Sequence, residues 1–188
     1  MAQNGIIDGS RFRLFWIDDR CVSIDNGRSN AGLAKRHLGS FWQQAEIYTI
    51  EGTLAPKQAA ADYETILNRF GGRSAFDMAL IGIGTDGHVA SLFPNDSALN
   101  ANGLAAAAKA PDGENRITVT FDMLAGCNQH LVLAWGAEKA PIVEQILRPT
   151  LSLKGSISPF ARACGNHPGV DVVMDQACAS NLSEPLDT

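Results

Sequence analysis

The 188-residue sequence has few cysteines and no long apolar run, and each scarcity excludes a class of protein. Its four cysteines include no C-x-x-C pair, so we expect neither a disulfide framework nor a zinc site. No window approaches the ~20 apolar residues of a membrane span, and the polar first ten residues lack the basic start and apolar core of a secretory signal. We therefore expect reduced thiols, a cytoplasmic location and no membrane partner.

Positive charge is also scarce. The chain has 15 Lys and Arg against 20 Asp and Glu, which gives a formal net charge of −5. Because nucleic-acid binding needs clustered Lys and Arg to neutralise phosphates, we expect no nucleic-acid partner. A few locally placed cations still suffice for an anionic small molecule. The hydrophobic content of 45% is ordinary for a globular protein.

Apolar runs alternate with segments of helical spacing along the chain. We expect strands at 11–17, 46–50, 76–83, 116–120, 130–135 and 170–174. We expect helices at 30–38, 56–70, 121–125, 138–147 and 158–163, with Asn30 as the cap of the first. This order predicts an α/β, Rossmann-like fold with a mostly parallel sheet flanked by helices. The expected division is an irregular or disordered start (1–10), one domain (11–179) and a frayed tail (180–188).

Two polar segments directly follow predicted strands. They are Asp18-Asp19-Arg20 and the glycine-rich loop 84–88 (GTDGH). Because ligands bind beyond the carboxyl ends of parallel strands, we expect both segments within reach of one ligand. A carboxylate beside an imidazole fixes its tautomer and raises its basicity, so Asp86 and His88 predict a pair that activates water. The backbone N–H groups from Gly84 to Gly87 are candidate oxyanion donors.

Other chemistries have weaker support. Residues 82–87 match the dinucleotide pattern G-x-G-x-x-G, but Pro94 cuts the following helix short, so we expect no nicotinamide cofactor. The histidines are widely spaced, which argues against a metal site; they are His37, His88, His130 and His167. No G-x-S-x-G elbow is present, and Ser91 is interpreted as a structural hydroxyl.

Three cations lie where they could meet an anionic ligand. Arg20 follows two carboxylates, so it is either part of a solvent-facing charge cluster or an anion clamp oriented by Asp18 or Asp19. Arg116 opens a predicted strand, and Lys139 follows one. Each of these two, taken alone, is an ordinary surface charge.

Residues 80–94 (LIGIGTDGHVASLFP) resemble the signature of the 6-phosphogluconolactonases. Residues 15–22 (FWIDDRCV) resemble that family's second block, a strand that ends in Asp-Glu-Arg, and residues 29–33 (SNAGL) resemble the following helix start. Further blocks fit in the family's order at 116–120, 136–139 and 156–175. The resemblance covers residues 12–178.

The resemblance implies the fold of the glucosamine-6-phosphate deaminase/lactonase type. It also implies hydrolysis of 6-phospho-D-glucono-1,5-lactone to 6-phosphogluconate in the pentose phosphate pathway, without metal or organic cofactor. His88 would act as general base on water with Asp86 supporting it, and Arg20 would bind phosphate with Asp18 holding it. The substrate-binding set implied for the phosphorylated sugar lactone is Arg20, Asp18, Gly84, Gly87, Arg116 and Lys139.

Glucosamine-6-phosphate deaminases carry a similar loop and are the less favoured alternative. Their loop continues as Ala-Phe-Asn-Glu-Pro, and their second block reads Asp-Glu-Tyr. This chain has ASLFP at 90–94 and Asp18-Asp19-Arg20. Both differences favour the lactonase.

The sequence departs from the family at its start, where a strand and a Ser-Gly-Gly-x-Thr-Pro loop have no counterpart. The only Gly-Gly pair, Gly71-Gly72, lies at a predicted helix end. We therefore expect a sheet that lacks its first strand, part of the phosphate cradle missing, and an exposed sheet edge that invites self-association. Two functions stay open: an active lactonase, or a truncated, non-catalytic relative that binds sugar phosphates or a partner.

Overall fold

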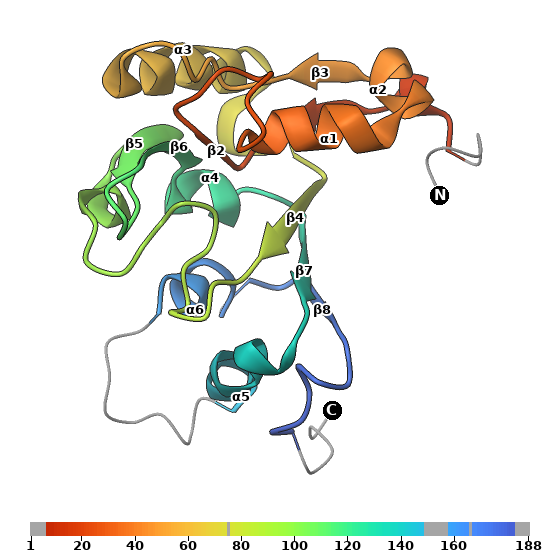
Figure 1. Cartoon of the computed structure of the whole chain (residues 1–188), viewed down its shortest axis with the longest axis vertical. Helices are drawn as coiled ribbons and strands as arrows, with labels where there is room; N and C mark the ends of the chain where they lie inside the picture. The colour runs from red at the N-terminus through yellow and green to blue at the C-terminus, as the bar shows by residue number, and fades with distance from the viewer. Residues whose placement is uncertain (1–6, 75, 149–157, 166, 183–188) are drawn as a thin grey trace.

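The computed structural model describes residues 7–74, 76–148, 158–165 and 167–182, which form an α/β arrangement (Figure 1). The strands are β1 (Arg13–Phe15), β2 (Asp18–Arg20), β3 (Glu46–Tyr48), β4 (Met78–Gly82), β5 (Ala105–Lys109), β6 (Asn115–Val119), β7 (Gln129–Ala134) and β8 (Val170–Met174). The α-helices are α1 (Asn30–Leu38), α2 (Ser40–Gln44), α3 (Pro56–Arg69), α4 (Phe121–Ala125), α5 (Ala140–Leu147) and α6 (Pro159–Cys164). Short 3-10 helices are η2 (Gly9–Arg11), η3 (Gly72–Ser74), η4 (Ser97–Asn100) and η5 (Ala137–Lys139).

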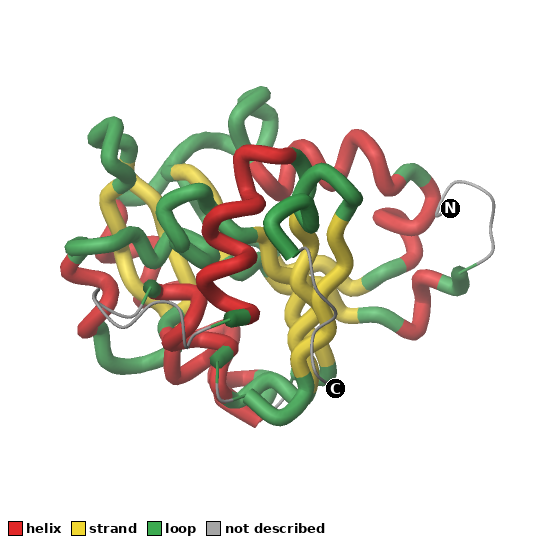
Figure 2. The backbone as a smooth tube through the Cα atoms, turned by 90° about the horizontal axis from the view of Figure 1, so that it is seen from below, coloured by secondary structure: helices red, strands yellow, loops and turns green. Residues whose placement is uncertain are grey.

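The described strands form three small sheets. β1 pairs with β3 in parallel, and β4, β7 and β8 form a parallel sheet in that order. β2, β6 and β5 form an antiparallel sheet. In Figure 2 the strands accordingly divide into separate groups with helices beside them. The prediction of an α/β fold with mostly parallel strands and flanking helices is confirmed.

Most predicted elements form where the sequence pattern indicates. Every apolar run expected to be a strand overlaps an observed one, and α1, α3, α4, α5 and α6 occupy the predicted helical segments. Two strands were not expected. Residues 18–20 were expected to be a loop but form β2, and the alanine-rich segment after residue 100 contains β5. Both strands pair with β6, so contacts distant in sequence override their weak local preference.

One face of the β4–β7–β8 sheet is covered by α5 and α6 (Figure 1). Val132 of β7 lines a small cavity there with Val143 of α5 and Phe160 of α6. On the opposite face Leu80 is 59% exposed and Val173 is 49% exposed. A parallel sheet normally has both faces covered, so this face is unusually open among the residues that the structure describes.

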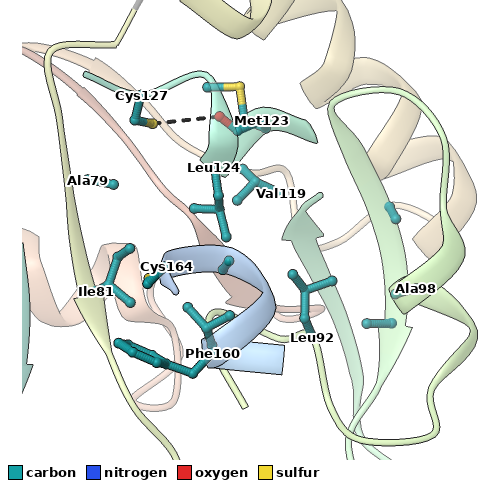
Figure 3. Packing of buried hydrophobic residues seen from close by; sticks show 14 of the residues in the cluster. Ala79, Ile81, Leu92, Ala98, Val119, Met123, Leu124, Cys127, Phe160 and Cys164 are labelled. Atoms are coloured by element: carbon teal, nitrogen blue, oxygen red, sulfur yellow. Dashed lines mark hydrogen bonds between the residues drawn. The ribbon is translucent and has the colours of Figure 1, made fainter. Parts of the chain in front are cut away.

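The buried core lies where β4, β6, α4 and α6 meet. Ile81, Val119, Leu124 and Phe160 are at most 2% exposed and belong to one contiguous cluster (Figure 3). This packing fixes the carboxyl end of β4, which carries the glycine-rich loop. Among the described residues, none of the helices has the length and apolar composition needed to cross a bilayer.

If the sheet lacks its first strand, as expected from the sequence, a neighbouring strand should have an unpaired edge. Within the described part of the chain, β1 pairs only with β3, and β4 pairs only with β7. Each of these strands therefore has one edge without a strand partner. Most of the expected irregular start and of the expected frayed tail lies outside the described residues, as does part of the block at 156–175.

Candidate active site

The loop that follows β4 is a tight turn closed by its own backbone. The N–H of Gly84 donates to the carbonyl of His88 at 2.9 Å, and the N–H of Gly87 donates to the carbonyl of Gly84 at 3.0 Å. These two N–H groups are therefore engaged within the loop. In this conformation the N–H groups of Gly84 and Gly87 contribute to the shape of the loop, and the expected donation from residues 84–87 to a substrate oxyanion stays a prediction.

Both glycines are required by that shape. A Cβ on Gly84 would overlap the His88 ring and the Asp86 carboxylate. Gly87 has a φ of +79°, and a Cβ there would lie 2.8 Å from the Cβ of Ser158. The carbonyl of Gly87 accepts from the N–H of Phe160 at 2.9 Å, so α6 is docked directly on the loop.

Asp86 and His88 form the pair that the sequence predicts. Oδ1 of Asp86 lies 2.6 Å from Nδ1 of His88 and also accepts from the His88 backbone N–H at 3.1 Å. Because a carboxylate only accepts hydrogen bonds, Nδ1 carries the proton and Nε2 is left with its lone pair. Burial alone would raise the pKa of Asp86, but the hydrogen bonds and charge of His88 together lower it. The pair therefore has the orientation of a general base held by a carboxylate.

The imidazole of His88 is also fixed by packing. Its side chain is 32% exposed, and its ring centroid lies 4.6 Å from that of Phe93. Val89 and Leu92, which follow His88, are fully buried. The loop is thus anchored on its carboxyl side, while the ring remains accessible to a ligand.

Asp18 and Asp19 point to opposite faces of β2, which separates their roles. Asp19 is 3% exposed and caps the start of α1, where it accepts from Ser29 Oγ at 2.9 Å and from the Ala31 N–H at 3.0 Å. Ser29 itself is the N-cap residue, and its Oγ accepts from the Gly32 N–H. The prediction of Asn30 as the cap is therefore wrong by one residue, and Asp19 is structural.

Asp18 faces the histidine loop instead. Its Oδ2 accepts from Ser91 Oγ at 2.7 Å, and the N–H of Ser91 donates to Oγ1 of Thr118 at 3.1 Å. Burial raises the pKa of Asp18, against the lowering effects of the Ser91 hydrogen bond and the Arg116 charge. Ser91, three residues beyond the loop, is the structural hydroxyl that joins this segment to β2, although β2 and β4 belong to different sheets. That the two polar segments reach one ligand stays a prediction.

Arg20 and Arg116 lie directly opposite each other on the paired strands β2 and β6. Arg20 donates to the carbonyl of Arg28 at 2.9 Å and to the side chain of Asn30. The Asn30 amide in turn donates to the carbonyl of Asp18 at 3.0 Å. Asn30 therefore connects Asp18 to Arg20, and the Asp18 carboxylate lies 3.9 Å from Arg116.

Glu114 is the residue of this region that the sequence interpretation missed. Its carboxylate lies 2.9 Å from Nη2 of Arg116 and also pairs with Arg28. The available signal was spacing. Glu114 directly precedes β6 and Arg116 lies two residues further on, a spacing that puts both side chains on one face of extended backbone.

Lys139 lies apart from these contacts. It ends η5, just beyond the carboxyl end of β7, the neighbour of β4. Its side chain makes no hydrogen bond or ion pair among the described residues. Lys139 thus shares the sheet edge with the histidine loop, but it is not joined to the arginines.

Metal-binding residues are not grouped in the described part of the chain. No three His, Cys, Asp or Glu side chains within it are arranged to hold a metal ion. All four cysteines are free thiols, and three of them are buried. The chemistry available at the described site is that of a histidine, carboxylates and arginines.

The fold and the site define the class of this molecule: an α/β protein with a histidine–carboxylate pair at the carboxyl edge of a parallel sheet, beside a cluster of arginines. A sequence model of the glucosamine-6-phosphate isomerase/6-phosphogluconolactonase family matches residues 1–171. The chain belongs to this family.

Individual relatives agree with this assignment. The chain is 34% identical over 182 residues to a 6-phosphogluconolactonase of Synechocystis, covering 92% of this chain and 74% of the relative. It is 34% identical over 171 residues to 6-phosphogluconolactonase-like protein 1 of Saccharomyces cerevisiae, covering 80% and 53% of the two chains. The crystal structure of a Thermotoga maritima 6-phosphogluconolactonase superposes with a TM-score of 0.74 at 25% identity, covering 90% and 75%.

The lengths of the relatives differ from that of this chain. The chain spans about half the length of the yeast relative and of plant relatives that it matches. It spans about three quarters of the Thermotoga maritima structure.

Proposed function

We propose that this chain hydrolyses 6-phospho-D-glucono-1,5-lactone to 6-phosphogluconate, as a step of the pentose phosphate pathway. The observation that carries the proposal is the 2.6 Å contact between Asp86 and His88, which leaves Nε2 of His88 free to accept a proton. The names of the relatives support the substrate, because several of them are 6-phosphogluconolactonases. No metal or organic cofactor is part of the proposal.

The chemistry needs one base and one attacking water. Nε2 of His88 accepts a proton from water while the water oxygen forms a bond to the lactone carbonyl carbon, and the carbonyl electrons move to its oxygen. The intermediate then collapses, the bond to the ring oxygen breaks, and the proton on His88 passes to that oxygen. Asp86 stabilises the imidazolium that exists between the two steps.

The phosphate of the substrate is proposed to bind at Arg20 and Arg116, because paired guanidinium groups hold phosphate in a forked geometry. Asp18 supports Arg20 through Asn30, and its carboxylate, which accepts from Ser91, lies 3.9 Å from Arg116. Lys139 is proposed to add positive charge from the end of β7. Gly84 and Gly87 contribute by shaping the loop beside the lactone.

The test is lactone hydrolysis by the purified chain at mildly acidic pH, where the spontaneous reaction is slow. His88→Ala is expected to lower the rate at least about a hundredfold, which is the usual contribution of a positioned base. His37→Ala is the matched control, because His37 is an exposed histidine on α1. Equal turnover by the wild type and His88→Ala would show that His88 is not the base.

The alternative is a non-catalytic relative that binds sugar phosphates. The observation in its favour is that the N–H groups of Gly84 and Gly87 are engaged within the loop rather than free for an oxyanion. A folded wild-type chain that binds 6-phosphogluconate without accelerating hydrolysis would establish this alternative. Release of ammonia from glucosamine 6-phosphate would instead establish the deaminase.

We further propose that two copies of the chain associate through the open edge of β4. The support is the lack of a second strand partner for β4 within the described residues, together with the exposed Met78 and Leu80. Sedimentation velocity should detect a dimer that Leu80→Lys abolishes and that Leu33→Lys, on exposed α1, retains. A wild-type monomer at high concentration would refute the proposal.

We also propose that the protein is cytoplasmic and that residues 11–179 form a single domain. Free thiols are typical of a reducing compartment. Limited proteolysis that leaves a fragment of these bounds would support the domain limits, and a stable smaller fragment would refute them.

A further inference from the structure

The arrangement of Arg20 and Arg116 has an electrostatic cost. They occupy directly opposed positions on β2 and β6, where neighbouring side chains lie close together. Like charges at such positions repel each other. The repulsion is strengthened by burial, since the side chain of Arg116 is only 13% exposed and that of Arg20 is 32% exposed.

Glu114 offsets this repulsion. Its side chain is 18% exposed, and its Oε2 lies 2.9 Å from Nη2 of Arg116 and 3.9 Å from Nε of Arg20. Its other oxygen pairs with Arg28, whose side chain is 63% exposed. One carboxylate therefore faces three guanidinium groups.

The cluster still retains unused capacity for an anion. The ion pairs of the three arginines are made with two carboxylates, Glu114 and Asp18, and Glu114 is shared by all three. Nε of Arg116 is buried and has no hydrogen-bond partner among the described residues. An arginine fork matches the oxygens of a phosphate, and two forks match them better than one.

We propose that Glu114 is an internal counter-anion of this site, which competes with a phosphate group for the guanidinium groups of Arg20 and Arg116. The inference rests on the proposed function in one respect: it takes the arginines as the receptor for the substrate's phosphate. In the ligand-free protein Glu114 keeps the arginines together. When phosphate binds, it takes over part of the hydrogen bonding that Glu114 provides.

The counter-anion role predicts the opposite change in phosphate affinity from a role in which Glu114 only orders the arginines. Replacing the carboxylate by an amide of the same shape removes the competitor and one negative charge, so phosphate should bind more tightly. A residue that only orders the arginines would give the opposite result, because its loss would scatter their side chains and weaken binding. The sign of the change therefore separates the two roles.

The experiment is calorimetric titration of inorganic phosphate into the full chain and into Glu114→Gln. The variant is expected to bind phosphate about fivefold more tightly. Phosphate then no longer has to displace the charge-assisted hydrogen bond and the partly exposed ion pair that the Glu114 carboxylate makes with the arginines. Glu46→Gln is the matched control, because Glu46 also pairs with an arginine, Arg13, at 2.9 Å. It should leave phosphate binding unchanged. Arg20→Met in the Glu114→Gln background should abolish binding, which locates the anion at the cluster.

Unchanged or weaker phosphate binding in Glu114→Gln would overturn the proposal, and so would a failure of both proteins to bind phosphate. If Glu114→Gln does not fold, Glu114→Asp tests the same point, because its shorter carboxylate reaches the arginines less well and should also tighten binding. Failure of both variants to fold would make Glu114 a structural counter-ion and refute the proposal.

The result is independent of turnover. Tighter phosphate binding in Glu114→Gln, together with a wild-type chain that does not hydrolyse the lactone, would support the counter-anion and refute the lactonase. Lactone hydrolysis with no tightening in Glu114→Gln would do the reverse.

Discussion

The hydroxyl of Ser91 donates a 2.7 Å hydrogen bond to Oδ2 of Asp18, a residue 73 positions earlier in the chain. Ser91 lies three residues after His88, and Asp18 lies two residues before Arg20. This contact therefore joins the segment that follows His88 to the strand that carries Arg20. Ser91 itself is fully buried.

Ser91→Ala should weaken both the fold and the site. Loss of a buried hydrogen bond to a charged group costs about 2 kcal/mol of unfolding free energy. The rate of lactone hydrolysis should fall as well, because the segment after His88 loses its hydrogen bond to Asp18 of β2. Urea unfolding measures the first effect, and kcat measures the second. Ser10→Ala removes an equally short hydrogen bond, from Ser10 to Asp8, at an exposed position and should change neither.

Gly84→Ala should inactivate the site with little loss of overall structure. The new Cβ would overlap the His88 ring and the Asp86 carboxylate, so the geometry of this pair must change. The rate of lactone hydrolysis should fall at least about a hundredfold, as for loss of the base. Gly82→Ala is the matched control two residues away, since a Cβ there meets no atom within 4 Å. Full activity of Gly84→Ala would contradict the role given to this loop.

His130 should make the fold sensitive to mild acid. It is fully buried, and its Nε2 donates to the carbonyl of Leu124 at 2.9 Å. Burial lowers its pKa from the ordinary 6.5. The unfolded chain then binds a proton more readily than the folded one, so the unfolding free energy is highest above pH 6.5 and declines as the pH falls below it.

Urea unfolding at pH 7.5 and pH 5 tests this sign. The wild type should be less stable at the lower pH, and His130→Gln should lose part of that difference. His37→Gln, which removes an exposed histidine, should keep it. A pH dependence that is identical in the wild type and His130→Gln would refute the assignment.

The fold was predictable where local pattern and tertiary environment agree. In β7 buried and half-buried residues alternate, in β8 half-buried and exposed ones, and the apolar pattern of each segment indicates a strand. The segments of β2 and β5 have no such pattern. Asp18–Arg20 is all charged and Ala105–Lys109 is mostly alanine, so only their pairing with β6 makes them strands.

The sequence predicted the residue types of the site, but not the hydrogen bonds and ion pairs that connect residues of different segments. The adjacency of Asp86 and His88 in a glycine loop indicated the pair, because both residues belong to one turn. The separate roles of Asp18 and Asp19 depend on strand alternation in β2, which was expected to be a loop. Local spacing indicates the contact of Glu114 with Arg116, but its contacts with Arg20 and Arg28, which come from a distant segment, could not be predicted in this way.

The most direct test of the central claim is the kcat of Asp86→Asn. An asparagine amide can donate to Nδ1 of His88, which would shift the imidazole proton to Nε2 and remove the base without changing the shape of the loop. The account predicts a fall in kcat of at least about a hundredfold with little change in KM, while Asp77→Asn, an exposed aspartate before β4, stays at the wild-type rate. A kcat for Asp86→Asn close to that of the wild type would contradict it.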